Sequence, residues 1–93
     1  MDCEITFDQL ERLEKPRVID MRQPEQFAYG TYPGAVNIPE GTLKREDCRE
    51  PVYLLCQSGV RSLELAEQWQ AQGVPAVSIR GGYREYLRRA LSR

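Results

Sequence analysis

One stretch of the sequence, residues 51–62, constrains the fold more than any other. It reads Pro-Val-Tyr-Leu-Leu-Cys-Gln-Ser-Gly-Val-Arg-Ser. Residues 52–55 have the length and the β-branched and aromatic content of a buried strand. Apolar residues spaced by three and four after Arg61 predict an amphipathic helix. A strand that feeds a helix through a short loop places Cys56 at the carboxyl end of a sheet, where α/β proteins hold their functional sites.

Cys56 stands where a thiol can be activated. The backbone N–H groups of the loop and the positive end of the following helix both favour an anion at this point. Gly59 can adopt the positive φ that such a loop needs, and Arg61 adds a formal charge within one turn. Together these features favour the thiolate, which is the attacking form of cysteine. The alternative is a small apolar cysteine that simply ends a strand.

Strands and helices alternate along the rest of the chain. Further strands are predicted over residues 3–5, 17–21, 35–38 and 75–79. Helices are predicted over residues 24–28, 60–72 and 83–91, with a first helix capped by Thr6 and broken at Pro16, and a single turn around Leu43. This alternation predicts an α/β fold with a parallel sheet and right-handed crossovers. We therefore expect a three-layer sandwich of about five mostly parallel strands with helices on both faces, as one domain over residues 1–93.

The spacing of apolar residues also predicts which helix faces turn inward. In the first helix these residues are Phe7, Leu10 and Leu13, and in the helix over 60–72 they are Val60, Leu63, Ala66 and Trp69. Leu65 falls off that stripe and is predicted to be partly covered. In the last helix the inward residues are Tyr83, Tyr86, Leu87, Ala90 and Leu91.

Several motifs resemble those of the rhodanese-domain sulfurtransferase family, and the resemblance covers nearly the whole chain. The central one is C-x-x-G-x-R at Cys56. The others are Val-Ile-Asp-Met-Arg at 18–22, Glu-Gln-Phe at 25–27 followed by Gly30, Pro-Gly-Ala-Val-Asn-Ile-Pro at 33–39, and Gly-Gly-Tyr at 81–83. Each motif alone is weak, but their order and spacing together are specific.

The resemblance implies an enzyme that carries sulfur as a persulfide on Cys56. The donor would be thiosulfate, glutathione persulfide or a persulfide-bearing protein, and the acceptor a thiol or cyanide. The loop residues that would hold the sulfur anion are Gln57, Ser58, Gly59, Val60, Arg61 and Ser62. Asp20 and Arg22 are expected to brace the segment under this loop. The resemblance implies no cofactor and no metal.

One position departs from the family pattern. Thr31 stands in the turn where the family usually has histidine, and the chain contains no histidine at all. This composition excludes Cys–His catalysis and a histidine-ligated metal site. Thr31 can make a side-chain hydrogen bond in the turn, so we expect a local adjustment there.

Two other functions are compatible with a cysteine in such a loop. A cysteine phosphatase or arsenate reductase places its arginine six positions after the cysteine, whereas Arg61 follows Cys56 by five. The shorter loop favours a single sulfur anion over a phosphate. A non-enzymatic rhodanese-like module, which acts as a sulfur carrier or interaction domain with a partner protein, remains an alternative, although loss of the loop cysteine would be its signature.

Composition limits the partners and the compartment. The net charge of −1 gives no electrostatic reason to expect nucleic acid, and no segment has the length and apolar character of a membrane span or signal peptide. Cys3 and Cys48 are expected to be bystanders, with Cys48 as a resolving thiol the alternative. An odd count of three cysteines at irregular spacing indicates neither a disulfide framework nor a zinc site, which favours a reducing cytoplasm. The arginines of the C-terminal segment form either a basic face for an anionic partner or a solvated helix end; these are Arg80, Arg84, Arg88, Arg89 and Arg93.

Overall fold

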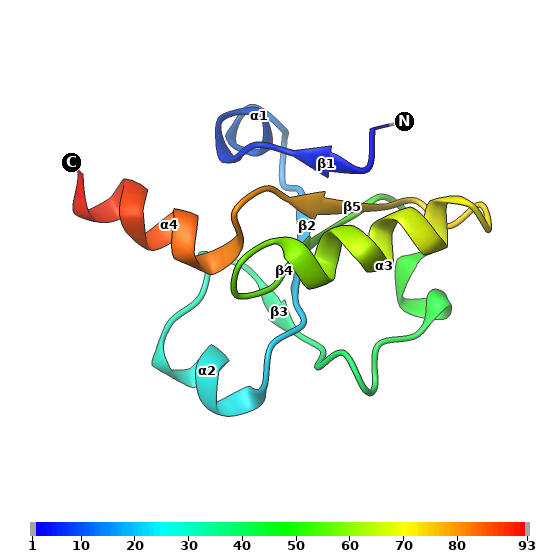
Figure 1. The fold of residues 1–93 in the computed structure, drawn as a ribbon, viewed down its shortest axis with the longest axis horizontal. Helices are drawn as coiled ribbons and strands as arrows, with labels where there is room; N and C mark the ends of the chain where they lie inside the picture. The colour runs from blue at the N-terminus through cyan, green and yellow to red at the C-terminus, as the bar shows by residue number, and fades with distance from the viewer. Residues whose placement is uncertain (1, 93) are drawn as a thin grey trace.

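A five-stranded sheet forms the centre of the computed structural model, which describes residues 2–92 (Figure 1). The strands are β1 (Glu4–Ile5), β2 (Arg17–Asp20), β3 (Val36–Asn37), β4 (Val52–Leu55) and β5 (Ala76–Ile79). The helices are α1 (Phe7–Glu11), α2 (Pro24–Tyr29), α3 (Val60–Gln70) and α4 (Gly82–Leu91), with a 3₁₀ helix, η1 (Arg45–Cys48). The strand order is β1-β5-β4-β2-β3, and every pairing among the described residues is parallel. The predicted fold class is confirmed.

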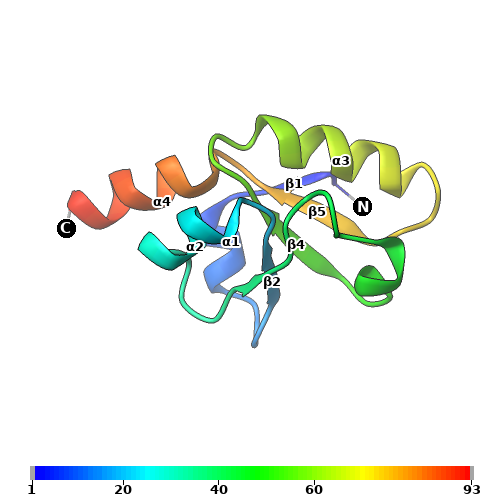
Figure 2. The same cartoon turned by 90° about the horizontal axis from the view of Figure 1, so that it is seen from below.

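Helices cover both faces of the sheet, because both faces are apolar. Figure 2 shows α3 along one face and α1 on the other, where the tyrosines of α4 also pack. Neighbouring side chains of a strand point to opposite faces, so Leu54 packs in the core beneath α3, whereas Leu55 packs with α1. Both are fully buried, as in most parallel sheets.

The buried face of α3 differs from the prediction. Leu65 is 8% exposed and belongs to the core, whereas Val60 is 64% exposed. The face that meets the sheet is Ser62, Leu65, Ala66 and Trp69, which has the spacing of one helical stripe. The apolar pattern missed it because the first member of the stripe is a serine, whose buried hydroxyl has partners inside the protein.

The ends of α1 and α4 are also more exposed than predicted. Leu13 lies beyond the end of α1 and is 39% exposed. In α4 the tyrosines pack against α1, but Leu87, Ala90 and Leu91 are exposed. Figure 1 shows the reason, since the second half of α4 extends past the sheet and has no layer to cover.

Some local predictions hold and others shift slightly. Thr6 forms the predicted capping box with Gln9. The helical turn expected around Leu43 is η1, a few residues later, and α3 ends at Gln70, two residues earlier than predicted. No helix among residues 2–92 has the length and apolar character needed to cross a bilayer.

Candidate active site

Cys56 lies at the junction of β4 and α3, with its sulfur enclosed by hydrogen-bonding groups. The backbone N–H groups of Gly59 and Ser62 donate to Sγ at 3.1 and 3.3 Å. The Ser62 hydroxyl oxygen lies 3.2 Å from the same sulfur. Cys56 is 6% exposed. The sulfur therefore sits among short-range dipoles that suit an anion.

The start of α4 fixes the loop from behind. The N–H groups of Tyr83 and Arg84 donate to the carbonyl oxygens of Cys56 and Gln57 at 2.8 and 3.0 Å. These two carbonyls are held on the α4 side of the loop, while N–H groups further along it meet the sulfur.

This contact requires glycine on both sides. At Gly59, with φ of 87°, a Cβ atom would lie 2.7 Å from the Gly81 nitrogen. At Gly82, with φ of 60°, a Cβ atom would overlap the Cys56 carbonyl oxygen. The left-handed backbone and the close approach both favour glycine, which explains the Gly-Gly pair that precedes Tyr83.

Two buried serines lie behind the sulfur. Ser62 and Ser78 are both fully buried, and their hydroxyl oxygens are 2.7 Å apart. Ser78 comes from β5 and was not found from the sequence. The feature that could have identified Ser78 is its place within the apolar strand Ala-Val-Ser-Ile. A polar side chain in a strand buried on both faces needs a hydrogen-bond partner.

A buried ion pair lies on the other side of the loop. Asp20 is fully buried and Arg22 is 7% exposed. The Arg22 Nη2 and Nε atoms donate to the Asp20 carboxylate, at 2.7 Å for the shortest contact. Thr31 Oγ1 donates to the same carboxylate at 2.7 Å. Thr31, in the position where histidine was expected, therefore makes the side-chain hydrogen bond that its sequence position suggested.

Arg22 connects this ion pair to the surrounding loops. Its Nη2 atom also donates to the Gly30 carbonyl at 2.7 Å, and its Nη1 atom reaches Gln57 Oε1 at 3.4 Å. The guanidinium lies over the Tyr83 ring, 4.1 Å from the ring centre. Arg22 thus joins the end of β2, the loop and the start of α4.

Arg61 lies outside the enclosure around Cys56. Its Nε atom donates to Glu40 Oε2 at 2.7 Å, and Nη1 reaches Glu64 at 3.4 Å. The hydrogen bond to Glu40, and then its charge, raise the pKa of Arg61 above its usual value. None of the hydrogen bonds to Sγ within residues 2–92 comes from Arg61. Arg61, predicted as a cation for the sulfur anion, is thus paired with two carboxylates instead.

The remaining loop residues line the solvent side. Gln57 and Val60 are exposed, and Ser58 is half-buried. Of the six predicted loop residues, all within the described part of the chain, Gly59 and Ser62 donate their N–H groups to the sulfur, and the other four make no hydrogen bond to it.

The other two cysteines lie in different surroundings. Cys48 is 1% exposed, and burial, followed by the charge of Asp47, raises the pKa of its thiol to about 11. Cys3 is half-buried, and its sulfur contacts Gln70 Oε1 at 3.3 Å. Neither sulfur has the N–H donors that surround Cys56.

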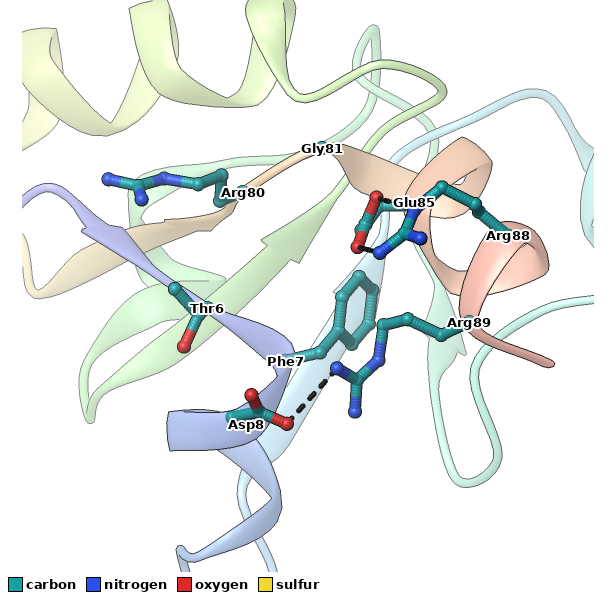
Figure 3. A pocket seen from close by; sticks show the side chains of 8 residues that line it. All are labelled: Thr6, Phe7, Asp8, Arg80, Gly81, Glu85, Arg88 and Arg89. Carbon is teal, nitrogen blue, oxygen red and sulfur yellow. Dashed lines mark hydrogen bonds and ion pairs between the residues drawn. The ribbon is translucent and has the colours of Figure 1, made fainter. Parts of the chain in front are cut away.

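A pocket of about 360 Å³ lies between α1 and α4 (Figure 3). It is lined by Thr6, Phe7, Asp8, Arg80, Gly81, Glu85, Arg88 and Arg89. Each arginine in it is paired with an acid: Arg80 with Glu4, Arg88 with Glu85, and Arg89 with Asp8 and Glu11. Their charges are offset locally, which favours the solvated-helix interpretation over a basic docking face. Arg93 lies outside the described residues.

The fold and the loop define a class: parallel α/β domains with a cysteine held at a helix N-terminus. The family comparison narrows this class. The model of the rhodanese-like domain matches residues 7–89, and the chain belongs to the rhodanese-like domain family.

Individual relatives agree with this assignment. The chain is 30% identical over 79 residues to the putative sulfurtransferase YtwF of Bacillus subtilis, covering 81% of this chain and 77% of that protein. It is 36% identical over 77 residues to YqhL of the same organism, covering 77% of this chain but 61% of the relative's length. The human single-domain sulfurtransferase TSTD1 shares the fold, with a TM-score of 0.77 at 24% identity over 95% of this chain and 97% of that one.

Proposed function

We propose that the chain is a sulfurtransferase that carries a sulfane sulfur as a persulfide on Cys56. The observation that carries this proposal is the set of groups around one sulfur: the N–H groups of Gly59 and Ser62 donate to it, and the Ser62 hydroxyl oxygen lies within hydrogen-bond distance of it. Membership of the rhodanese-like family and the likeness to YtwF support it.

In the loading step the Cys56 thiolate attacks the outer sulfur of a donor persulfide, R–S–SH. A bond forms between Sγ and that sulfur, the S–S bond of the donor breaks, and R–S⁻ leaves with the electron pair. The proton stays on the transferred sulfur or is lost to solvent. The N–H groups of the loop stabilise the anion before and after the step, as preorganised dipoles do in other enzymes.

In the unloading step the outer sulfur passes to an acceptor. A thiolate R′–S⁻ attacks it, the bond to Sγ breaks, and Cys56 leaves as a thiolate while R′–S–SH forms. Cyanide reacts in the same way and leaves as thiocyanate. Each cycle returns Cys56 to its starting state, and no external oxidant or reductant is consumed.

The charges around the loop favour a persulfide donor over thiosulfate. Thiosulfate is a dianion, and at about 4 Å and an effective dielectric constant of about 20 each unit charge pair contributes roughly 4 kcal/mol before desolvation. Arg61 is engaged by Glu40 and Glu64, and Arg22 by Asp20. The donor is therefore glutathione persulfide or the persulfide of a partner protein, and Asp20 and Arg22 serve to brace the loop.

Intact-mass measurement tests the proposal. After treatment with glutathione persulfide and removal of excess reagent, the protein should gain one sulfur atom. Cys56→Ser should gain none, while Cys3→Ser and Cys48→Ser should load like the unmodified protein. Release of the sulfur to an added thiol completes the test.

Two outcomes would change the assignment. Loading of Cys56→Ser to the same extent would rule out Cys56 as the carrier. Loading without repeated turnover on small thiols or cyanide would favour the carrier module, which delivers sulfur only to a partner protein.

A further inference from the structure

A buried chain of hydroxyl groups runs from the Cys56 sulfur into the sheet. The sulfur lies 3.2 Å from Ser62 Oγ, which lies 2.7 Å from Ser78 Oγ. The carbonyl oxygen of Gly59 lies beside both serines, 3.4 Å from Ser62 Oγ and 3.5 Å from Ser78 Oγ. Both serines are fully buried. Because water does not reach them, the two hydroxyl groups can donate, within the described chain, only to one another, to the Cys56 sulfur or to the Gly59 carbonyl oxygen.

When Cys56 is a thiol, the chain runs outward from the sulfur. The thiol donates to Ser62 Oγ. The Ser62 proton then goes to the Gly59 carbonyl at 3.4 Å while Ser78 donates to Ser62, or it goes to Ser78, whose own proton goes to that carbonyl at 3.5 Å. The final contact is long, and hydrogen bonds weaken at such distances.

When Cys56 is a thiolate, the chain reverses. The sulfur has no proton and becomes an acceptor, so the Ser62 hydroxyl turns to it. The Ser62 oxygen accepts from Ser78 across the 2.7 Å contact, so neither hydroxyl needs the long contact to the Gly59 carbonyl. In the anionic state both hydroxyl protons therefore point along the chain toward the sulfur, and linked hydrogen bonds strengthen one another.

From this geometry we propose that Ser78 is a positioning residue for sulfur transfer. By donating to Ser62 it turns the Ser62 proton onto the Cys56 sulfur anion and away from the Gly59 carbonyl. Ser78 touches neither the sulfur nor a substrate, and its effect passes through Ser62 alone. The consequence for turnover rests on the function proposed above, whereas the effect on the thiolate does not.

The effect should differ between the two half-reactions. In loading, the chain raises the fraction of Cys56 that is thiolate, which matters only at pH values where that fraction is limiting. In unloading, Cys56 is the leaving group, so stabilising its anion speeds the step at every pH. Loss of the Ser78 hydroxyl therefore slows unloading throughout, and loading only toward lower pH.

Three variants test the proposal. Ser78→Ala removes the hydroxyl, and Ser78→Thr keeps it. Val77→Ala is the matched control, because Val77 lies in the same strand, is 5% exposed, and, as the neighbour of Ser78, directs its side chain to the opposite face of the sheet. The readouts are the pH profile of Cys56 alkylation by iodoacetamide in a Cys3→Ser/Cys48→Ser background, and the rate of unloading to a thiol.

The expected result is specific to the hydroxyl. Ser78→Ala should alkylate and unload about threefold to tenfold more slowly near pH 7, consistent with weakening one charge-assisted hydrogen bond, and its alkylation midpoint should move to higher pH. Ser78→Thr should restore both, and Val77→Ala should change thermal stability alone. A Ser78→Ala variant that loses stability but keeps the wild-type profile and unloading rate would overturn the proposal.

A double-mutant cycle with Ser62→Ala decides the route and does not depend on Ser78→Thr folding. If Ser78 acts through Ser62, the double variant should be no slower than Ser62→Ala alone. Additive losses would overturn the proposal. Because alkylation needs no sulfur donor, a protein that fails to form a persulfide but shows the predicted alkylation cycle would contradict the proposed function and support the role of Ser78.

Discussion

Two buried polar clusters flank the active-site loop, and they differ in charge. The first consists of Cys56, Ser62 and Ser78, whose side chains carry no formal charge as long as the thiol is protonated. The second consists of a full ion pair between buried Asp20 and Arg22, together with the half-buried Thr31. In both, every buried side-chain nitrogen and oxygen atom has a partner, as is true of all described residues. Both clusters thus satisfy the hydrogen bonds of buried polar atoms, the first with neutral groups and the second with charged groups.

The difference shows which cluster can take part in chemistry. The carboxylate of Asp20 already accepts from the Arg22 backbone, the Arg22 side chain and Thr31. The charges of Asp20 and Arg22 therefore interact with each other, and Arg22 also donates to the neighbouring loops. The hydroxyls of the uncharged cluster can reverse direction when the sulfur gains or loses a proton. The ion pair therefore holds the loop, whereas neutral dipoles hold the sulfur.

Breaking the charged cluster should have the largest effect on stability. Asp20→Ala leaves Arg22 buried without its counter-ion, and removal of one partner of a buried pair costs about 3–5 kcal/mol. Urea unfolding followed by circular dichroism measures the loss. Ser62→Ala is the comparison in the other cluster and should lower the unfolding free energy by about 1 kcal/mol. Equal losses in the two variants would contradict the division of roles.

Removing one hydroxyl from each cluster should separate stability from activity. Ser62→Ala deletes the hydroxyl beside the sulfur and should slow sulfur transfer by about tenfold or more, since hydrogen bonds to charged groups contribute about 1.5–3 kcal/mol. Thr31→Val deletes a hydroxyl that donates to Asp20 and should lower the midpoint of thermal unfolding. Its transfer rate, measured well below that midpoint, should stay within about twofold, because Thr31 donates to Asp20 and its loss leaves the N–H donors to the sulfur in place. The opposite pattern would reverse the assignment of the two clusters.

Adding a charge beside the uncharged cluster should change which donor is used. Val60 is 64% exposed at the start of α3, so Val60→Lys places a cation at the mouth without disturbing the core. We expect KM for thiosulfate to fall severalfold, and the gain to shrink at high salt because exposed charges are screened. KM for glutathione persulfide should change little. Steady-state kinetics with both donors measures the difference.

Arg61→Gln is the control for this charge. Arg61 is paired with Glu40 and Glu64, so its removal should change neither KM by more than about twofold, in line with the weak energetics of exposed ion pairs. A large rise in the thiosulfate KM of Arg61→Gln would mean that the guanidinium reaches the donor despite its two carboxylates.

The sequence predicted what depends on local pattern and missed what depends on tertiary contacts. The junction of strand, loop and helix at Cys56 is encoded within residues 51–62, and Asp20 and Arg22, which form the ion pair, are only two positions apart. The partner of Arg61 is Glu40, 21 positions earlier, and the partner of Ser62 is Ser78, 16 positions later. Neither pairing leaves a periodic signal. The buried face of α3 was misread for the same reason, since Ser62 is buried only because Ser78 and Cys56 meet it there.

The two buried cysteines extend the comparison and give the smallest predicted effect. Cys56 accepts from two N–H groups, whereas the Cys48 sulfur contacts the carbonyl oxygen of Lys44 at 3.8 Å and lies near Asp47. A carbonyl can only accept, so the surroundings of Cys48 favour the neutral thiol. Burial and Asp47 accordingly raise the pKa of Cys48 to about 11, above the value of about 8.5 for an unfolded chain.

This raised pKa should appear in the pH dependence of stability. Between about pH 8.5 and 11 the folded state keeps the Cys48 proton while the unfolded state loses it, so the unfolding free energy falls as pH rises. Cys48→Ala is less stable at neutral pH because it loses packing, but its unfolding free energy does not fall through ionisation of this thiol. The stability difference between the two proteins should therefore be constant below about pH 8 and shrink from about pH 8.5 upward. Urea unfolding at a series of pH values measures it, and a difference that stays constant to pH 10.5 would show that the Cys48 thiolate is tolerated in the core.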